Sequence, residues 1–291
     1  MSILKLAGTK RWLGWLSFVI LFALVCVGLA QWQWARRLEA VAEIRTVAAN
    51  WDAAPTSLDD VVPRGGTLDP EREWTPILLE GEYLLDEQVL VRNRPLSGRP
   101  GFEVLVPLQL DDGRVVIVDR GWLPTGEAQD SPDAVPGAPS GPVEVIVRLK
   151  PSEPEIAGRG APDGQIATIH LPELAERLEQ GVPGIDAGAV VTGAYGLLDE
   201  ETPAPDERPV AATRPVADEG PHLSYTFQWY LFGLLGFVGY GWAIRNEHRG
   251  LRAAERGESE PPAPKPRRSG PSDGDVEDAI LDRQASEINS A

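Results

Sequence analysis

The run WLGWLSFVILFALVCVGLAQWQW, residues 12–34, decides the architecture of this chain. It contains no charged residue, and a helix of about 22 residues is roughly 33 Å long, enough to cross a hydrocarbon core of ~30 Å. A second uncharged run, LSYTFQWYLFGLLGFVGYGWAI, occupies residues 223–244. Tryptophan and tyrosine lie at the ends of both runs, as in the interfacial belts of membrane helices. The two runs therefore predict two spanning helices, at 12–34 and 222–244.

The first run also has features of a secretory signal peptide. Basic residues precede it, and Gly28-Leu29-Ala30 resembles a small-residue cleavage site. Its apolar stretch is longer than the roughly 7–15 residues of a signal h-region, so we expect an uncleaved anchor. Cys26, the only cysteine of the chain, lies inside the run. No disulfide within the chain can form, and a folded domain must depend on its core.

Basic residues flank both runs on the sides away from the intervening segment, which predicts the orientation. The positive-inside rule puts both termini in the cytoplasm, and Arg36 and Arg37 oppose it only weakly. We expect a protein of a bacterial-type cell membrane, crossed twice. The flanking residues are Lys5, Lys10 and Arg11 before the first run, and Arg245, Arg249, Arg252 and Arg256 after the second.

The net charge of the 291 residues is −17, and the segment between the two runs carries this excess. An acidic outer domain excludes nucleic acid as a partner. It fits a solvated acidic surface, and equally a domain that meets a basic partner. Residues beyond about 253 combine proline, serine and mixed charge, which is typical of disorder.

Between the runs the pattern changes from helical to extended. Residues 35–49 have no glycine or proline, so the first helix is expected to continue outward. Beyond residue 74, segments rich in valine and isoleucine alternate with turn residues, and Asp111-Asp112-Gly113 predicts a hairpin. The fold class expected is α+β: two transmembrane helices flanking an extracytoplasmic, mainly antiparallel β domain. We expect strands at 74–84, 88–94, 102–110, 114–122, 142–150 and 189–198, a short helix at 171–180, and an irregular return at 199–219.

These expectations divide the chain into five parts. They are a cytoplasmic N-terminus at 1–11, a first transmembrane helix at 12–34, an extracytoplasmic mainly-β domain at 35–221, a second transmembrane helix at 222–244, and a cytoplasmic, largely disordered tail at 245–291.

Catalytic motifs are absent from the sequence. It contains no Cys–His pair, HExxH, GxSxG or Walker motif, and no pair of carboxylates stands out. We therefore expect no enzyme, and no catalytic residue is proposed. Of the three histidines, His170 fits a structural position at a strand end and His248 a solvated basic flank.

His222 differs because it opens the second run at the outer interface. On a helix, it shares one face with aromatic and glycine residues that lie within about 60° of one another. This face is compatible with a flat macrocycle, with an imidazole as axial iron ligand, rings for stacking and glycines for close approach. It is equally compatible with close helix packing at the glycines and an ordinary aromatic belt. The residues are His222, Tyr225, Trp229, Gly233, Gly236 and Tyr240.

Three stretches resemble the Surfeit locus protein one family, the membrane-bound assembly factors of haem–copper cytochrome c oxidase. The likeness covers about residues 12–249, and Ala30 stands where the family has a glycine. The stretches are LAQWQWARR at 29–37; VRNR at 91–94 with GRPGF at 98–102 and VDRGW at 118–122; and HLSYTFQWY at 222–230.

The resemblance implies a non-enzymatic role in building the oxidase, with haem a bound transiently on its way into the large catalytic subunit. The implied partners are that subunit, other oxidase assembly factors, haem a and the lipid bilayer. His222 matches the family's candidate haem ligand, with Tyr225 and Trp229 as neighbouring contacts. Arg120 could pair with a haem propionate or, as we favour, with an acid of its own domain. Trp122 is expected in the core. The alternative is a two-span membrane adaptor or scaffold with no cofactor.

Overall fold

The computed structural model describes residues 2–127, 130–156 and 158–257. They form two compact units. The helix unit contains the described residues of Met1–Trp32 and Ser224–Ala291, and the β unit is Gln33–Leu223. The predicted disordered tail falls outside the described residues from position 258 onward.

Helix α2, Lys10–Asn50, confirms that the first apolar run continues as a helix beyond residue 34. A short helix α1, Ile3–Ala7, precedes it and is capped by the Ser2 hydroxyl. Within the described chain, α2 alone is long and apolar enough to cross a membrane by length and composition, which indicates a membrane protein. The second span remains a prediction. Helix α4, His222–Glu255, begins where expected but runs past Ile244, so the first part of the predicted disordered tail is helical.

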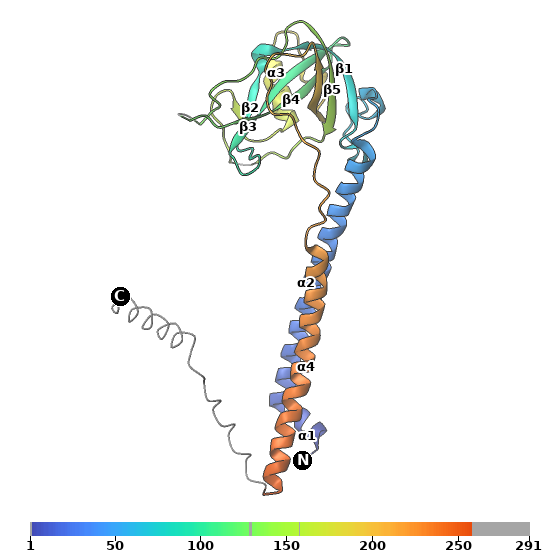
Figure 1. Cartoon of the computed structure of the whole chain (residues 1–291), viewed down its shortest axis with the longest axis vertical. Coiled ribbons are helices and arrows are strands. Elements are labelled where there is room, and N and C mark those ends of the chain that lie inside the picture. Colours follow the sequence, from blue (N-terminus) through green and yellow to red (C-terminus); the bar gives the residue numbers. More distant parts are fainter. Residues whose placement is uncertain (1, 128–129, 157, 258–291) are drawn as a thin grey trace, which may run out of the picture. The chain divides into compact units, whose positions relative to one another are not determined.

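In the helix unit, α2 and α4 pack antiparallel, side by side (Figure 1). Their less exposed residues recur in steps of four and three, the seven-residue repeat of left-handed helix pairs. At the middle of the seam a Cβ on Gly233 would lie 3.5 Å from Cys26 Cβ, so small residues let the two backbones approach. The repeat is Trp12, Leu16, Val19, Ala23, Cys26 and Ala30 on α2, facing Thr226, Trp229, Gly233, Gly236, Tyr240, Ala243 and Glu247 on α4.

The β unit is built on one seven-stranded sheet in the order β1-β5-β7-β4-β3-β2-β6 (Figure 1). An extra β1–β3 pairing closes five of the strands into a ring. Most pairs are antiparallel, as predicted, whereas β2–β6 and β4–β7 are parallel. The strands are β1 Pro76–Tyr83, β2 Val89–Val91, β3 Gly101–Leu110, β4 Val115–Pro124, β5 Pro142–Lys150, β6 Gln165–Ile166 and β7 Tyr195–Thr202.

The predicted strand at 189–198 is corrected in position, because β7 begins at Tyr195 and ends at Thr202. Residues before it form a 3-10 turn, Ala187–Ala189, and the first residues of the predicted irregular return belong to the strand. Strand β6 was not predicted, because two residues are too few for a periodic pattern. The other expected strands and the hairpin at Asp111-Asp112-Gly113 are confirmed.

Alternation along the strands sorts their side chains into two cores. On β5 every second residue is buried, so Val143, Val145, Val147 and Leu149 point inward while their neighbours are more exposed. A second cluster forms where helix α3, Leu171–Gly181, covers the other side of the sheet with its apolar face. The predicted helix at 171–180 is thereby confirmed.

Candidate functional site

The first candidate site is the junction between α2 and the start of α4, within the β unit. Gln33 Oε1 lies 2.8 Å from His222 Nδ1. A carboxamide oxygen only accepts hydrogen bonds, so this contact corresponds to the His222 tautomer with the proton on Nδ1. The two residues come from separate stretches of the family resemblance and are 189 positions apart.

A second pair lies one turn further along α2. Arg37 Nη2 lies 2.8 Å from Glu219 Oε2, and the Arg37 guanidinium also lies 5.6 Å from the Trp34 ring centroid. Glu219 precedes α4 by three residues. The Arg37 guanidinium and the Gln33 amide of α2 therefore both contact residues at or just before the start of α4. The segment that leads from β7 to α4 therefore reaches His222 with contacts to α2 at both Glu219 and the imidazole.

The helix face below His222 only partly matches the sequence expectation. Tyr225 is exposed and Trp229 is half-buried, and both follow His222 on α4. Gly233 and Gly236, however, face α2: a Cβ on Gly236 would lie 3.4 Å from the Phe22 ring. The predicted notch for a macrocycle is occupied by side chains of α2, and the helix-packing explanation of the glycines is confirmed.

Arg120 lies inside the β unit and not at a binding surface. Its side chain is fully buried, and Nη2 forms an ion pair of 2.8 Å with Glu201 Oε1. Nη1 donates to the Pro136 carbonyl oxygen at 3.1 Å. The intradomain partner that we favoured from the sequence is confirmed. Burial and, second, the Glu201 charge raise the pKa of Tyr83, whose hydroxyl also faces this carboxylate.

The second stretch of the family resemblance has three fragments, at 91–94, 98–102 and 118–122, and these come together in one cluster. The Trp122 indole donates to the Arg94 carbonyl oxygen at 2.6 Å, and the Trp122 ring lies against Gly101. A Cβ on Gly101 would come within 2.4 Å of this ring, which explains the glycine at that position. Trp122 is buried, as expected. The Arg94 guanidinium pairs with Glu103 at 2.8 Å and with Glu153.

Sequence reasoning missed the carboxylates of this cluster. Asp119 is buried, and its pKa is raised well above 3.8, first by burial and then by the Glu103 charge. Burial also raises the pKa of Glu103. Burial acts to raise the pKa of Glu153, but hydrogen bonds from Arg94, Thr168 and the Ile169 N–H, together with the Arg94 charge, lower it. The signal available was Asp119 within the quoted VDRGW stretch, an acid among valines.

A cavity of about 370 Å³ adjoins this cluster. Its walls combine aromatic rings of Trp74, Trp122 and Tyr195 with Lys150 and Asp119. Within the described residues, no group of three or more His, Cys, Asp or Glu side chains could hold a metal ion. Neither the junction nor this cluster pairs a nucleophile with a base.

A long apolar helix that continues into a folded β unit indicates a membrane protein, and its motif residues serve in pairing and packing. Sequence comparison gives the family: the SURF1 family matches residues 20–234, and the chain belongs to it. This is a family of assembly factors, generally associated with cytochrome oxidase assembly, and not a known class of enzymes.

Relatives extend over most of the chain. SURF1-like proteins of Mycobacterium bovis and Mycobacterium tuberculosis are 32% identical over 261 residues, covering 87% of this chain and 91% of theirs. A SURF1-like protein of Monosiga brevicollis is 24% identical over 280 residues, covering 90% of this chain and 97% of its own.

Proposed function

We propose that this protein assists assembly of haem–copper cytochrome c oxidase by holding haem a transiently at the α2–α4 junction before its transfer to the large catalytic subunit. The observation that carries the proposal is the Gln33–His222 contact. The contact orients the imidazole, and in the tautomer with the proton on Nδ1 the lone pair lies on Nε2, as an axial iron ligand requires.

The fit of haem to the structure is limited to the junction. His222 supplies a ligand nitrogen, and Tyr225 and Trp229 supply aromatic surface further along α4. The glycine seam does not take part, because α2 fills it. Arg120 does not contact a propionate in this proposal, since its side chain is buried in the interior and pairs there with Glu201 and the Pro136 carbonyl oxygen. Other assembly factors of the oxidase complete the set of proposed partners.

The proposed arrangement in the membrane is two spans, α2 and α4, with both termini in the cytoplasm of a bacterial-type cell and the β unit outside. The uncharged stretch of α4 and the arginines after it support this orientation. A reporter enzyme active only outside the cytoplasm tests it. Fused after Ala291 it should be silent, and inserted after Gly137 it should be active; an active fusion at Ala291 rejects the two-span arrangement.

The haem proposal is tested by absorbance of the detergent-purified full chain from a host that makes haem a. We expect His222→Ala to lower haem occupancy and the yield of mature oxidase while membrane insertion is unchanged. His248→Ala, on the same helix, is the matched control and should retain haem. An unchanged spectrum in His222→Ala rejects ligation by His222. Wild-type protein without haem favours the adaptor alternative.

A further inference from the structure

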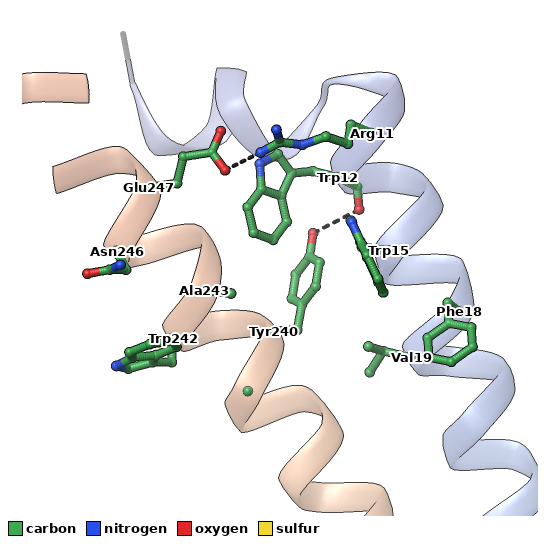
Figure 2. Close-up of a pocket in the computed structure, with 11 residues that line it drawn as sticks. Arg11, Trp12, Trp15, Phe18, Val19, Tyr240, Trp242, Ala243, Asn246 and Glu247 are labelled. Carbon is green, nitrogen blue, oxygen red and sulfur yellow. Dashed lines mark hydrogen bonds and ion pairs between the residues drawn. The ribbon is translucent and has the colours of Figure 1, made fainter. Parts of the chain in front are cut away.

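A groove lies between α2 and α4 in the helix unit, at the end of the pair that carries Arg11 and Glu247 (Figure 2). Its volume is about 600 Å³. Aromatic side chains from both helices form its walls: Trp12, Trp15 and Phe18 on α2, and Tyr240 and Trp242 on α4.

Side-chain contacts between the two helices form one wall of the groove. The rings of Trp12 and Tyr240 meet edge to face, with centroids 5.4 Å apart, and the Tyr240 hydroxyl donates to the Trp12 carbonyl oxygen. Gly239 leaves part of the groove open, because a Cβ there would meet no atom within 4 Å. Apolar walls with one open side suit a flexible hydrocarbon chain.

A polar group with no partner lies in the wall. The Trp12 indole nitrogen is buried and has no hydrogen-bond partner among the described residues. An indole N–H is only a donor, so it favours a ligand with an acceptor oxygen. Figure 2 shows the indole beside the Arg11 side chain, whose guanidinium pairs with Glu247. Arg11 is still largely exposed.

The charge at this end of the helix unit is positive. Seven basic side chains stand against two acids, Glu247 and Glu255, in the described segments 2–11 and 245–257. Basic side chains beside membrane helices attract anionic lipid headgroups. The basic residues are Lys5, Lys10, Arg11, Arg245, Arg249, Arg252 and Arg256.

We propose that this groove binds one anionic phospholipid. An acyl chain lies along the aromatic walls, and phosphate oxygens accept from the Trp12 indole and face Arg11. The proposal rests on the membrane insertion of α2 and α4 proposed above, and it is independent of haem. Bound in this way, the lipid ties the two helices together at the end opposite the His222 junction along α4.

The test is native mass spectrometry of the detergent-purified full chain, delipidated and mixed with phosphatidylglycerol or phosphatidylethanolamine of identical acyl chains. We expect one phosphatidylglycerol adduct, at least about fivefold more occupied than the phosphatidylethanolamine adduct, since each basic residue near the headgroup favours the anion. Equal occupancy of the two lipids rejects an anionic site.

Two glycine variants locate the site. Gly239→Leu fills the groove, whereas Gly241→Leu adds the same side chain to the same helix outside it, also with no atom within 4 Å of its Cβ. We expect phosphatidylglycerol to be lost from the first and kept by the second. Trp12→Phe, which keeps an aromatic ring but removes the donor, should weaken binding. If all three variants retain the lipid as wild type does, the groove is not the site. Because no haem is needed, these results are independent of the outcome for His222.

Discussion

Arg120 and Glu201 form an ion pair inside the β unit, with Nη2 and Oε1 2.8 Å apart and side chains that are 0% and 1% exposed. The pair joins β4 to β7, two strands that lie side by side in parallel. A charge buried at this depth is tolerated only when its partner and further hydrogen bonds satisfy it. The Pro136 carbonyl oxygen accepts from Arg120 Nη1, and the Tyr83 hydroxyl donates to Glu201 Oε2, whereas Arg120 Nε has no hydrogen-bond partner among the described residues.

We expect Arg120→Met to lower the free energy of unfolding by about 3–5 kcal/mol, because it leaves the Glu201 carboxylate buried without its cation. The double variant Arg120→Met, Glu201→Gln should recover much of this loss. Urea unfolding of the full chain in detergent, followed by tryptophan fluorescence, measures both. Arg64→Met, in an exposed pair with Asp112, is the control and should change stability little. A double variant as unstable as the single one contradicts the explanation.

Gly101→Ala should destabilise the β unit by about 1–3 kcal/mol, through overpacking against Trp122 and the Leu123 carbonyl oxygen. Gly137→Ala, where a Cβ meets nothing within 4 Å, provides the comparison. Thermal unfolding of both variants is the measurement. Equal melting temperatures of the two variants would contradict the overpacking explanation.

Asp119→Asn should make stability less dependent on pH. The folded pKa of Asp119 lies above its ordinary value of 3.8, so the unfolded chain releases this proton more readily than the folded one. Wild-type stability therefore falls relative to the variant as pH rises from about 4 to the folded pKa, by at most about 1.4 kcal/mol per pH unit. The asparagine oxygen can still accept from the Gly121 N–H. Urea unfolding of both proteins across this pH range measures the difference, and parallel pH profiles contradict the prediction.

Gln33→Met should weaken haem retention by about 10–100-fold if His222 is the ligand, because second-shell partners orient a ligating imidazole. Gln33→Glu, which keeps an acceptor, should retain more. Nitrogen-15 chemical shifts of His222 report the tautomer without haem, and in Gln33→Met the Nδ1–H form should lose population. Gln31 lies on the same helix as Gln33 and donates a hydrogen bond to Tyr230 of α4, so Gln31→Met is the control and should leave these shifts unchanged. Unchanged shifts in Gln33→Met would remove Gln33 from the site.

Local sequence patterns predicted the long helices and strands well. Residues 12–50 carry no helix-breaking residue beyond two isolated glycines, and α2 follows them without interruption. The strand at 142–150 was predicted at its observed bounds because its alternation is regular and turn residues flank it. The segment 189–198 was misplaced because both its ends are apolar, so only the pairing with β4 and β5 decides where the strand begins.

The sequence by itself determined the apolar helix, the β character of the segment between the two apolar runs, and the family, because these depend on composition, short-range periodicity and the quoted motifs. The tertiary structure alone decided the partners. Arg120 pairs with Glu201, 81 residues away, and His222 contacts the Gln33 amide, 189 residues away. Gly233 packs against the side chain of Cys26. Such contacts depend on which strands and helices become neighbours, and a chain of many acids and several arginines offers more pairings than its sequence can rank.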